Sequence, residues 1–208
     1  MVEADETYRT VAEGASASFT VQGSAFIGHV APAESVGAAE AFVEQVTESY
    51  DDATHDVPAY RVRAGDSTLG SGMTREYSSD DGEPSGSAGK PALNVLQGEE
   101  LENVVCVITR YYGGTNLGTG GLARAYGRAT KEAIAAATTI EQRPYERARV
   151  TVEYDDSGTV RGVLESNDIG FEAAYEERVT FAIRMPASDS VALYDRLRSA
   201  TSGRARIE

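Results

Sequence analysis

A stretch of apolar residues, Asn103–Thr109, runs into a glycine-rich segment and then into the alanine-rich stretch Leu122–Ala137. An unbroken apolar run is typical of a strand buried on both faces. The alanine, arginine and glutamate content of the second stretch favours a helix. Glycine permits positive φ angles and close approach of the backbone to another group. The sequence therefore predicts a central strand that turns into a helix packed on the same sheet.

The same region lacks acid, although the chain has a formal net charge of −14. No aspartate or glutamate occurs from Asn103 to Lys131. At 100° per residue, Arg124, Arg128 and Lys131 fall on one stripe of the predicted helix. The opposite side carries small apolar residues, namely Leu122, Ala125, Ala129, Ala133 and Ala136. We expect a helix that buries its alanine face and exposes a basic stripe, and an ordinary solvated surface helix is the alternative.

The glycine-rich turn predicts an anion site, most simply one for phosphate, because free amides and the helix dipole meet at a helix N-terminus. A Walker A loop is excluded because no Gly-Lys-Ser/Thr sequence is present, and the dinucleotide fingerprint lacks its adjoining strand and acid. The tyrosines Tyr111 and Tyr112 either stack on bases or pack at the strand end. The expected ligand-binding residues are Arg110, Tyr111, Gly113, Gly114, Gly118, Gly120, Gly121, Arg124, Arg128 and Lys131.

A second polar segment, Ser78–Pro91, contains three carboxylates close together, Asp80, Asp81 and Glu83. Carboxylates suit hard metals, but the spacing of a calcium-binding loop is missing. The carboxylates are alternatively expected to pair with an arginine such as Arg110 or Arg124, or to form a solvated turn. We assign Asp80, Asp81, Glu83, Gly86 and Lys90 to this motif loop and expect no metal and no cofactor. His55 has acidic neighbours but no nucleophile motif beside it.

Composition sets further bounds. No apolar run is long enough to cross a bilayer, and the N-terminus shows no signal-peptide pattern, so we expect a cytoplasmic protein. The single cysteine, Cys106, lies in an apolar run and is expected to be buried. The chain has 33 acidic residues against 19 basic ones, and only Lys90 and Lys131 are lysines. We interpret this pattern as the adaptation of a halophilic archaeon.

Hydrophobic periodicity predicts an α+β protein of two domains, 1–140 and 145–208, separated near Thr139–Arg147. In the first part we expect strands at Tyr8–Ala12, Ala17–Gln22, Ala25–Val30 and Tyr60–Ala64, helices at 35–50 and Pro91–Gln97, and a long loop from Gly65 to Gly89. From Arg149 onward the elements follow the order βαββαβ, which is typical of a ferredoxin-like domain.

Two long motifs, SSDDGEPSGSAGKPALNVL and VITRYYGGTNLGTGGLARAYGRATKEA, closely resemble the signature of the YigZ/IMPACT family. The likeness covers roughly Phe19–Ala137. It implies an N-terminal domain similar to the second domain of a small-subunit ribosomal protein, and a C-terminal domain similar to elongation-factor domains. The matching positions are Asp80, Asp81, Gly82, Glu83, Pro84, Gly86, Gly89, Pro91, Arg110, Tyr111, Gly113, Gly114, Leu117, Gly118, Gly120, Gly121 and Tyr126, with His55 before them. Ser24-Ala25-Phe26 departs from the family by lacking a cation before the phenylalanine.

The resemblance implies a cytosolic regulator of translation or a nucleic-acid binder, and it implies no enzymatic activity. Our leading hypothesis is therefore a non-enzymatic protein that binds RNA, the ribosome or translation factors through the glycine and arginine site. One alternative is an enzyme acting on a phosphorylated small molecule or nucleotide, with His55 or a loop carboxylate as acid or base. Another is a protein-interaction adaptor that uses the acidic loop or the tail sheet.

Overall fold

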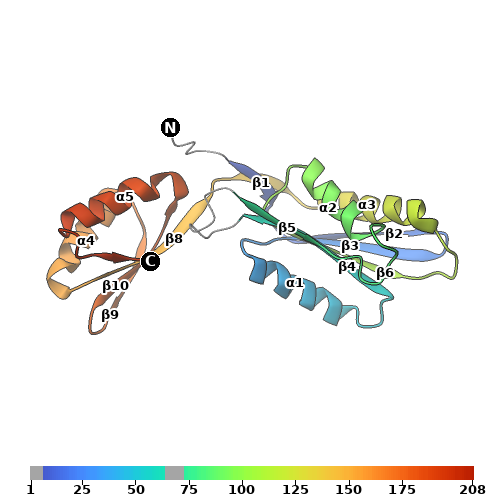
Figure 1. The fold of residues 1–208 in the computed structure, drawn as a ribbon, viewed down its shortest axis with the longest axis horizontal. Coiled ribbons are helices and arrows are strands. Elements are labelled where there is room, and N and C mark those ends of the chain that lie inside the picture. The colour runs from blue at the N-terminus through green and yellow to red at the C-terminus, as the bar shows by residue number, and fades with distance from the viewer. Residues whose placement is uncertain (1–6, 64–72) are drawn as a thin grey trace. The chain divides into compact units, whose positions relative to one another are not determined.

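The structure is a computed structural model and describes residues 7–63 and 73–208 (Figure 1). The chain forms two compact units, Tyr8–Gln142 and Arg143–Glu208, each with its own apolar core. Both units combine an antiparallel sheet with helices, so the α+β fold class is confirmed. Within the described residues, no helix has both the length and the apolar character needed to cross a bilayer.

The first unit is built on a five-stranded antiparallel sheet in the order β2-β3-β6-β4-β5. Its strands are β2 (Ala15–Val21), β3 (Ser24–Pro32), β4 (His55–Arg63), β5 (Thr74–Ser78) and β6 (Val104–Tyr111). The prediction that the apolar strand is central is confirmed, because β6 lies between β3 and β4 and is buried from Val104 to Arg110.

Helices cover both faces of this sheet (Figure 1). Helix α1 (Val36–Ser49) packs on one face, and α2 (Gly89–Gly98) and α3 (Gly118–Ala136) pack on the other. Successive residues of a strand point to opposite faces. Cys106 and Ile108 of β6 therefore contribute to the α2–α3 side, while Val105 packs on the α1 side. Arg110 continues the row of Cys106 and Ile108 toward the α2–α3 side.

A two-stranded antiparallel ribbon joins β1 (Tyr8–Val11) to β7 (Thr139–Gln142), with Tyr8 opposite Gln142. The Tyr8 hydroxyl also donates a 2.9 Å hydrogen bond to the Gln142 side chain. Strand β7 was not expected, and it lies in the stretch where the sequence places the domain boundary. None of its four residues is buried, so hydrophobic periodicity gives no sign of it.

Three further differences from the expected elements of the first unit exceed two residues. Strand β4 begins at His55 rather than Tyr60, and β5 occupies part of the expected loop, whose residues 65–72 lie outside the described residues. Strand β5 is an edge strand held by backbone pairing and by contacts of its polar side chains, so it lacks apolar alternation. Its Glu76 pairs with Arg61 at 2.8 Å, and its Tyr77 stacks on Tyr60 with ring centroids 5.0 Å apart.

The third difference concerns the glycines. Helix α3 begins at Gly118, one turn earlier than expected, so Gly118, Gly120 and Gly121 form its first turn rather than preceding it. The buried face of α3 includes Leu122, Ala125, Ala129 and Ala133, as the helical wheel predicts, while Ala136 is exposed. Arg124, Arg128 and Lys131 are exposed, so the predicted basic stripe is confirmed as a surface feature.

The second unit has the predicted βαββαβ order and is ferredoxin-like. Its elements are β8 (Tyr145–Val152), α4 (Tyr154–Ser166), β9 (Phe171–Tyr175), β10 (Val179–Pro186), α5 (Ala187–Ala200) and β11 (Arg206–Ile207). The antiparallel sheet has the order β11-β8-β10-β9. Both helices pack on one face, where Val150, Phe181 and Leu197 are fully buried. The arginines that alternate with the apolar residues of β8 lie on the opposite, open face.

Candidate functional site

Three residues on neighbouring strands form a row at one end of the sheet. Phe26 on β3 and His55 on β4 are both register partners of Arg110 on β6. The Arg110 guanidinium lies 5.5 Å from the Phe26 ring centroid and 5.3 Å from that of Tyr112. Only 4% of Arg110 is exposed. This arginine, expected to contact an anion, therefore points into the unit instead of toward solvent.

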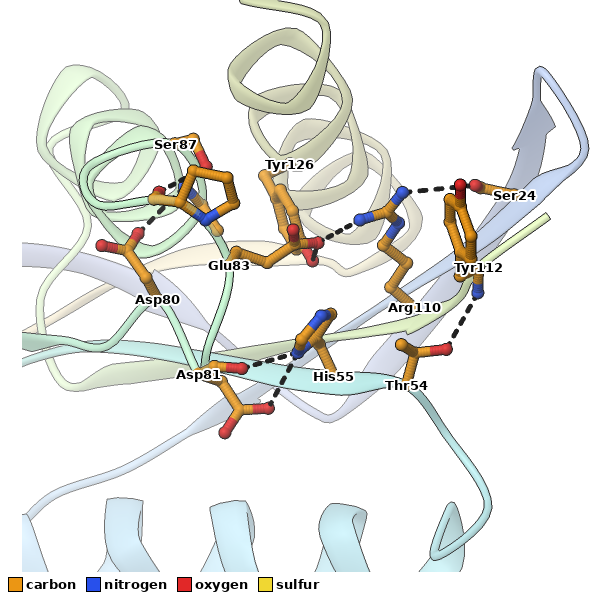
Figure 2. A network of polar contacts seen from close by, with 12 residues as sticks. Ser24, Thr54, His55, Asp80, Asp81, Glu83, Ser87, Arg110, Tyr112 and Tyr126 are labelled. Carbon is orange, nitrogen blue, oxygen red and sulfur yellow. Dashed lines mark hydrogen bonds and ion pairs between the residues drawn. The ribbon is translucent and has the colours of Figure 1, made fainter. Parts of the chain in front are cut away.

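The counter-charge of Arg110 is Glu83, which the motif loop places between the sheet and α3 (Figure 2). Arg110 Nη1 donates to Glu83 Oε1, and the Tyr126 hydroxyl donates to the same oxygen at 2.8 Å. Burial, and then the hydrogen bond to Glu83, raise the pKa of Tyr126 above its usual value. Of the interpretations left open for the loop carboxylates, pairing with Arg110 is confirmed for Glu83.

Asp80 holds the shape of the same loop. Its carboxylate accepts hydrogen bonds from the backbone amides of Gly86, Ala88 and Gly89 at 2.7, 3.0 and 2.9 Å. The last two amides belong to the start of α2, so Asp80 caps that helix from eight residues away. Partial burial acts to raise the pKa of Asp80, but the three backbone hydrogen bonds outweigh it and hold the pKa below its usual value.

Asp81 joins the loop to the first residues of β4. Its backbone has φ 45°, followed by Gly82 at φ 83°, which makes a tight left-handed turn. The Asp81 carbonyl oxygen lies 2.6 Å from His55 Nδ1, and its carboxylate accepts from the Asp56 amide at 2.7 Å. Because a carbonyl oxygen only accepts, Nδ1 of His55 carries the proton of the neutral ring and Nε2 is left as the acceptor.

The turn after β6 is tied to the β2–β3 hairpin. The Gly113 amide donates to the Ser24 hydroxyl at 3.1 Å, and Arg110 approaches the same oxygen at 3.4 Å. A Cβ on Gly113 would lie 1.9 Å from the Gly23 carbonyl carbon, so only glycine fits there. Gly113 is thus required by close backbone packing. Gly114 follows with φ 81° and open space around its Cα.

The exposed part of the expected site is a groove of about 240 Å³ between β2 and α3. Its walls include Phe19 and Leu117, and Arg124 and Arg128 line it from α3. The Arg128 guanidinium lies 4.0 Å from the Phe19 ring centroid and donates to Glu132 at 2.7 Å. The groove combines an apolar wall with two guanidinium groups, an arrangement that suits a ligand with both charge and flat apolar surface.

The start of α3 opens beside this groove. The N-cap residue, Leu117, makes no side-chain hydrogen bond to the helix. The first-turn residues Gly118, Thr119 and Gly120 are exposed. The first amides of a helix have no intrahelical acceptor, so they are available to an anion. The structure therefore brings the first-turn glycines near Arg124, whose Nη1 lies 3.5 Å from the Cβ position built on Gly120.

The remaining expected residues are spread around this end of the unit. The Tyr111 hydroxyl donates to Asp52 at 2.6 Å, and that bond with partial burial raises the pKa of Tyr111 to about 12. Tyr112 is 46% exposed and bonds through its amide to Thr54 at 2.9 Å. Lys90 and Lys131 are exposed, on α2 and α3 respectively. They do not join the Arg110 network.

Chemically, the site divides into a closed part and an open part. Asp80, Asp81 and Glu83 are all committed to internal hydrogen bonds, and among the described residues no group of three or more potential metal ligands gathers. The open part consists of the groove and the first turn of α3. Sequence reasoning missed Phe19 and Ser24 as neighbours of the site, because only the β2–β3 hairpin brings them to the glycine turn.

Comparisons with known proteins agree with this architecture. The Impact N-terminal domain matches residues 22–134, and a domain of unknown function, DUF1949, matches residues 150–204. The chain is 30% identical over 203 residues to the IMPACT family member YvyE of Bacillus subtilis (strain 168), covering 97% of this chain and 90% of that protein. It is 36% identical over 169 residues to the IMPACT family member YigZ of Escherichia coli (strain K12), covering 81% and 80%.

A solved structure also resembles this chain over nearly its whole length. The crystal structure of a hypothetical protein matches with a TM-score of 0.71 and 31% identity, covering 97% of this chain and 96% of that one. The long motifs that suggested the resemblance fall inside the matched Impact N-terminal domain. The chain therefore belongs to the IMPACT family.

Proposed function

We propose that the protein is a non-enzymatic regulator of translation that binds RNA of the translation machinery in the cytoplasm through the groove between β2 and α3. The binding surface consists of Arg124 and Arg128, the first turn of α3 and, at the far end of the basic stripe, Lys131. Arg110 is left out of the surface, because its charge is neutralised inside the unit by Glu83.

The observation that carries this proposal is the groove itself. Two exposed arginines line an apolar hollow on a chain whose acidic residues outnumber its basic ones by 33 to 19. Arginine presents a planar fork that matches phosphate geometry and also stacks on flat rings. Arg128 already stacks on Phe19, which fixes its guanidinium at the groove edge. A phosphate contact here would be positioned by a preordered side chain, which lowers the entropy lost on binding.

The network behind the groove gives it a rigid base. Glu83 links the motif loop to β6 through Arg110 and to α3 through Tyr126. Tyr126 and Arg128 are two residues apart on the same helix, so the buried bond fixes the helix that carries the cations. The motif loop would then act on binding by positioning, without touching the ligand.

Such a surface suits a salty cytoplasm. At about 1 M salt the Debye length is only about 3 Å, so long-range attraction between charges is screened. Short hydrogen bonds from backbone amides and guanidinium groups survive this screening better than a diffuse cluster of lysines would. The scarcity of lysine in the chain, two residues in all, is compatible with that mode of recognition.

Co-sedimentation of the full-length protein with purified ribosomes tests the proposal over a range of KCl concentrations. The variant Arg124→Glu/Arg128→Glu is compared with Arg75→Glu/Arg178→Glu, which makes the same change of charge at exposed positions on β5 and on the β9–β10 turn. The groove variant should lose at least about tenfold in affinity, since a hydrogen bond to a charged group is worth roughly 1.5–3 kcal/mol. The control should bind like the wild type.

The alternatives give different results in the same assay. If both double variants bind ribosomes equally well, the groove is not the binding surface. If ribosome binding persists after complete removal of exposed RNA by nuclease, the protein is an adaptor that recognises a protein partner. No specific observation favours the enzyme alternative. The loop carboxylates are held in internal hydrogen bonds, and Nδ1 of His55 is bonded to the Asp81 carbonyl.

A further inference from the structure

The open face of the C-terminal sheet carries a concentration of arginine that is unusual for this chain. The side chains of Arg147 and Arg149 on β8, Arg184 on β10 and Arg206 on β11 alternate with the buried core residues of their strands and are exposed. We call these four residues the arginine face. The acidic residues of the same face are Glu172 on β9 and Glu208, which pairs with Arg206. Cations thus outnumber acids here, the reverse of the whole chain.

Strand register brings two of these cations together. Arg147 and Arg184 are direct partners across β8 and β10. Arg149 is the next residue of β8 on the same face, and its partner on β10 is Ala182. Like charges directly opposite in an antiparallel pair destabilise a sheet. Cations at direct partner positions concentrate positive charge on this face, which suits a ligand with negative charge.

The surface between the arginines is low and flat. Ala174, Thr180 and Thr151 form one row across β9, β10 and β8, and the two threonine hydroxyls lie 3.2 Å apart. Ala182 beside them is also short and exposed. The side chains of Ala174, Ala182 and the two threonines are short, so a planar group can lie on them between guanidinium groups.

One end of the face carries an aromatic ring. Tyr145 is 53% exposed, and the Arg184 guanidinium lies 4.3 Å from its ring centroid. A ring paired with a guanidinium is a common platform for a stacked nucleobase. The face therefore offers charge for a phosphate backbone together with two kinds of flat surface for bases.

We infer that the arginine face binds single-stranded RNA. An acidic protein segment would use the positive charge but would gain little from the flat rows and the exposed ring. A duplex hides the faces of its bases and is recognised through shape and backbone instead. Single strands expose bases that stack on aromatic and guanidinium planes. This inference rests on the proposed function in taking RNA as the ligand, but it concerns a different surface in the other unit.

Fluorescence anisotropy of the full-length protein with a labelled oligouridylate of about twelve nucleotides tests the inference, since single-strand sites span roughly 4–16 nucleotides. The test variant is Arg149→Glu/Arg184→Glu. The matched control is Arg196→Glu/Arg198→Glu, which reverses two exposed charges on α5, the helix that packs on the opposite face of the sheet. The test variant should bind at least about tenfold more weakly than wild type, and the control should bind within about twofold.

Two further variants separate charge from stacking. Tyr145→Ala should weaken binding severalfold and leave the slope of log K against log[KCl] unchanged, because it removes no cation. Arg149→Lys/Arg184→Lys should keep the slope but recover only part of the affinity, because lysine lacks the planar fork. All three positions are exposed, and thermal unfolding by circular dichroism checks that each variant is folded.

Several results would overturn the inference. These are the absence of oligouridylate binding by wild type, equal binding by the test and control variants, or equal competition by a duplex of the same length or by polyglutamate. The proposed function is scored separately, by ribosome co-sedimentation of the Arg124→Glu/Arg128→Glu variant. Loss of ribosome binding in that variant with normal oligouridylate binding supports both surfaces. If Arg124→Glu/Arg128→Glu binds ribosomes normally and only Arg149→Glu/Arg184→Glu loses oligouridylate binding, the proposed groove is wrong and the arginine face stands.

Discussion

Arg110 and Glu83 form an ion pair whose side chains are only 5% and 4% exposed. The pair joins the central strand β6 to the motif loop, and Tyr126 adds α3 by donating to the same carboxylate oxygen. Charged groups are this deeply buried only when they are paired. The most conspicuous arginine of the glycine-rich motif is therefore a structural cation, and the exposed arginines of α3 are left to meet a ligand.

Removing one partner of this pair should destabilise the first unit strongly. Glu83→Ala leaves Arg110 buried without a counter-charge, and the expected loss in free energy of unfolding is about 3–5 kcal/mol. Urea unfolding followed by tyrosine fluorescence measures it, because the chain has no tryptophan. The double variant Glu83→Met/Arg110→Met removes both charges and should be more stable than Glu83→Ala. A loss in Glu83→Met/Arg110→Met equal to the summed losses of Glu83→Met and Arg110→Met would show that the pair is not coupled.

The cap formed by Asp80 predicts a dependence of stability on pH. The pKa of Asp80 is lowered in the folded state, so its stabilisation is present above the unfolded pKa of about 4 and is lost as pH falls through the folded pKa. Asp80→Asn should cost about 1–2 kcal/mol near neutral pH and flatten this acid dependence. Asp51→Asn, at an exposed position, is the control. Parallel pH profiles for wild type and Asp80→Asn would contradict the assignment.

Three glycines of the same motif should respond differently to alanine. Gly113→Ala places a Cβ 1.9 Å from the Gly23 carbonyl carbon and should destabilise the unit by more than about 3 kcal/mol. Gly114→Ala meets open space but has φ 81°, so a loss of about 1 kcal/mol is expected. Gly120→Ala, within α3, should gain about 0.5–1 kcal/mol. Thermal unfolding of the three variants tests this order, and any other order contradicts it.

The thiol of Cys106 should be inert in the folded protein. Burial raises the pKa of Cys106 to about 12, and the residue lies at the middle of β6 with no exposed surface. Because the thiolate is the reactive form, alkylation by iodoacetamide at neutral pH should occur only after unfolding by urea. Rapid labelling of native protein, detected by mass spectrometry, would place the thiol within reach of solvent.

Much of the fold could be predicted because the strongest patterns are local. The apolar run of β6 and the alanine face of α3 each follow from residues close together in sequence. Strand β5 could not be predicted, because its polar side chains gain their contacts from β4 and α2, as when Gln97 donates to Glu76 at 2.7 Å. The start of α3 was placed too late, because glycine has low helix propensity and tertiary packing overrides it here.

The site was predicted in composition better than in arrangement. The sequence drew attention to Arg110, but its pairing with Glu83 depends on a loop 27 residues away and was only one of several alternatives. The ligand-binding roles of Arg124, Arg128 and the first-turn glycines stay predictions. The arginine face cannot be recognised from the sequence of β8 alone. It requires the register with β10, since Arg147 and Arg184 are far apart in sequence.

The β1–β7 ribbon has a consequence for how the first unit can be cut and rejoined. Tyr8 and Gln142, at the two ends of the unit, are register partners, so a short peptide linker can connect them without disturbing the sheet. A circular permutant with those ends joined and new termini opened at the exposed Gly114 should keep the same strand order. The ribbon holds the two ends of the unit to each other, so the unit is closed on itself whatever chain carries it.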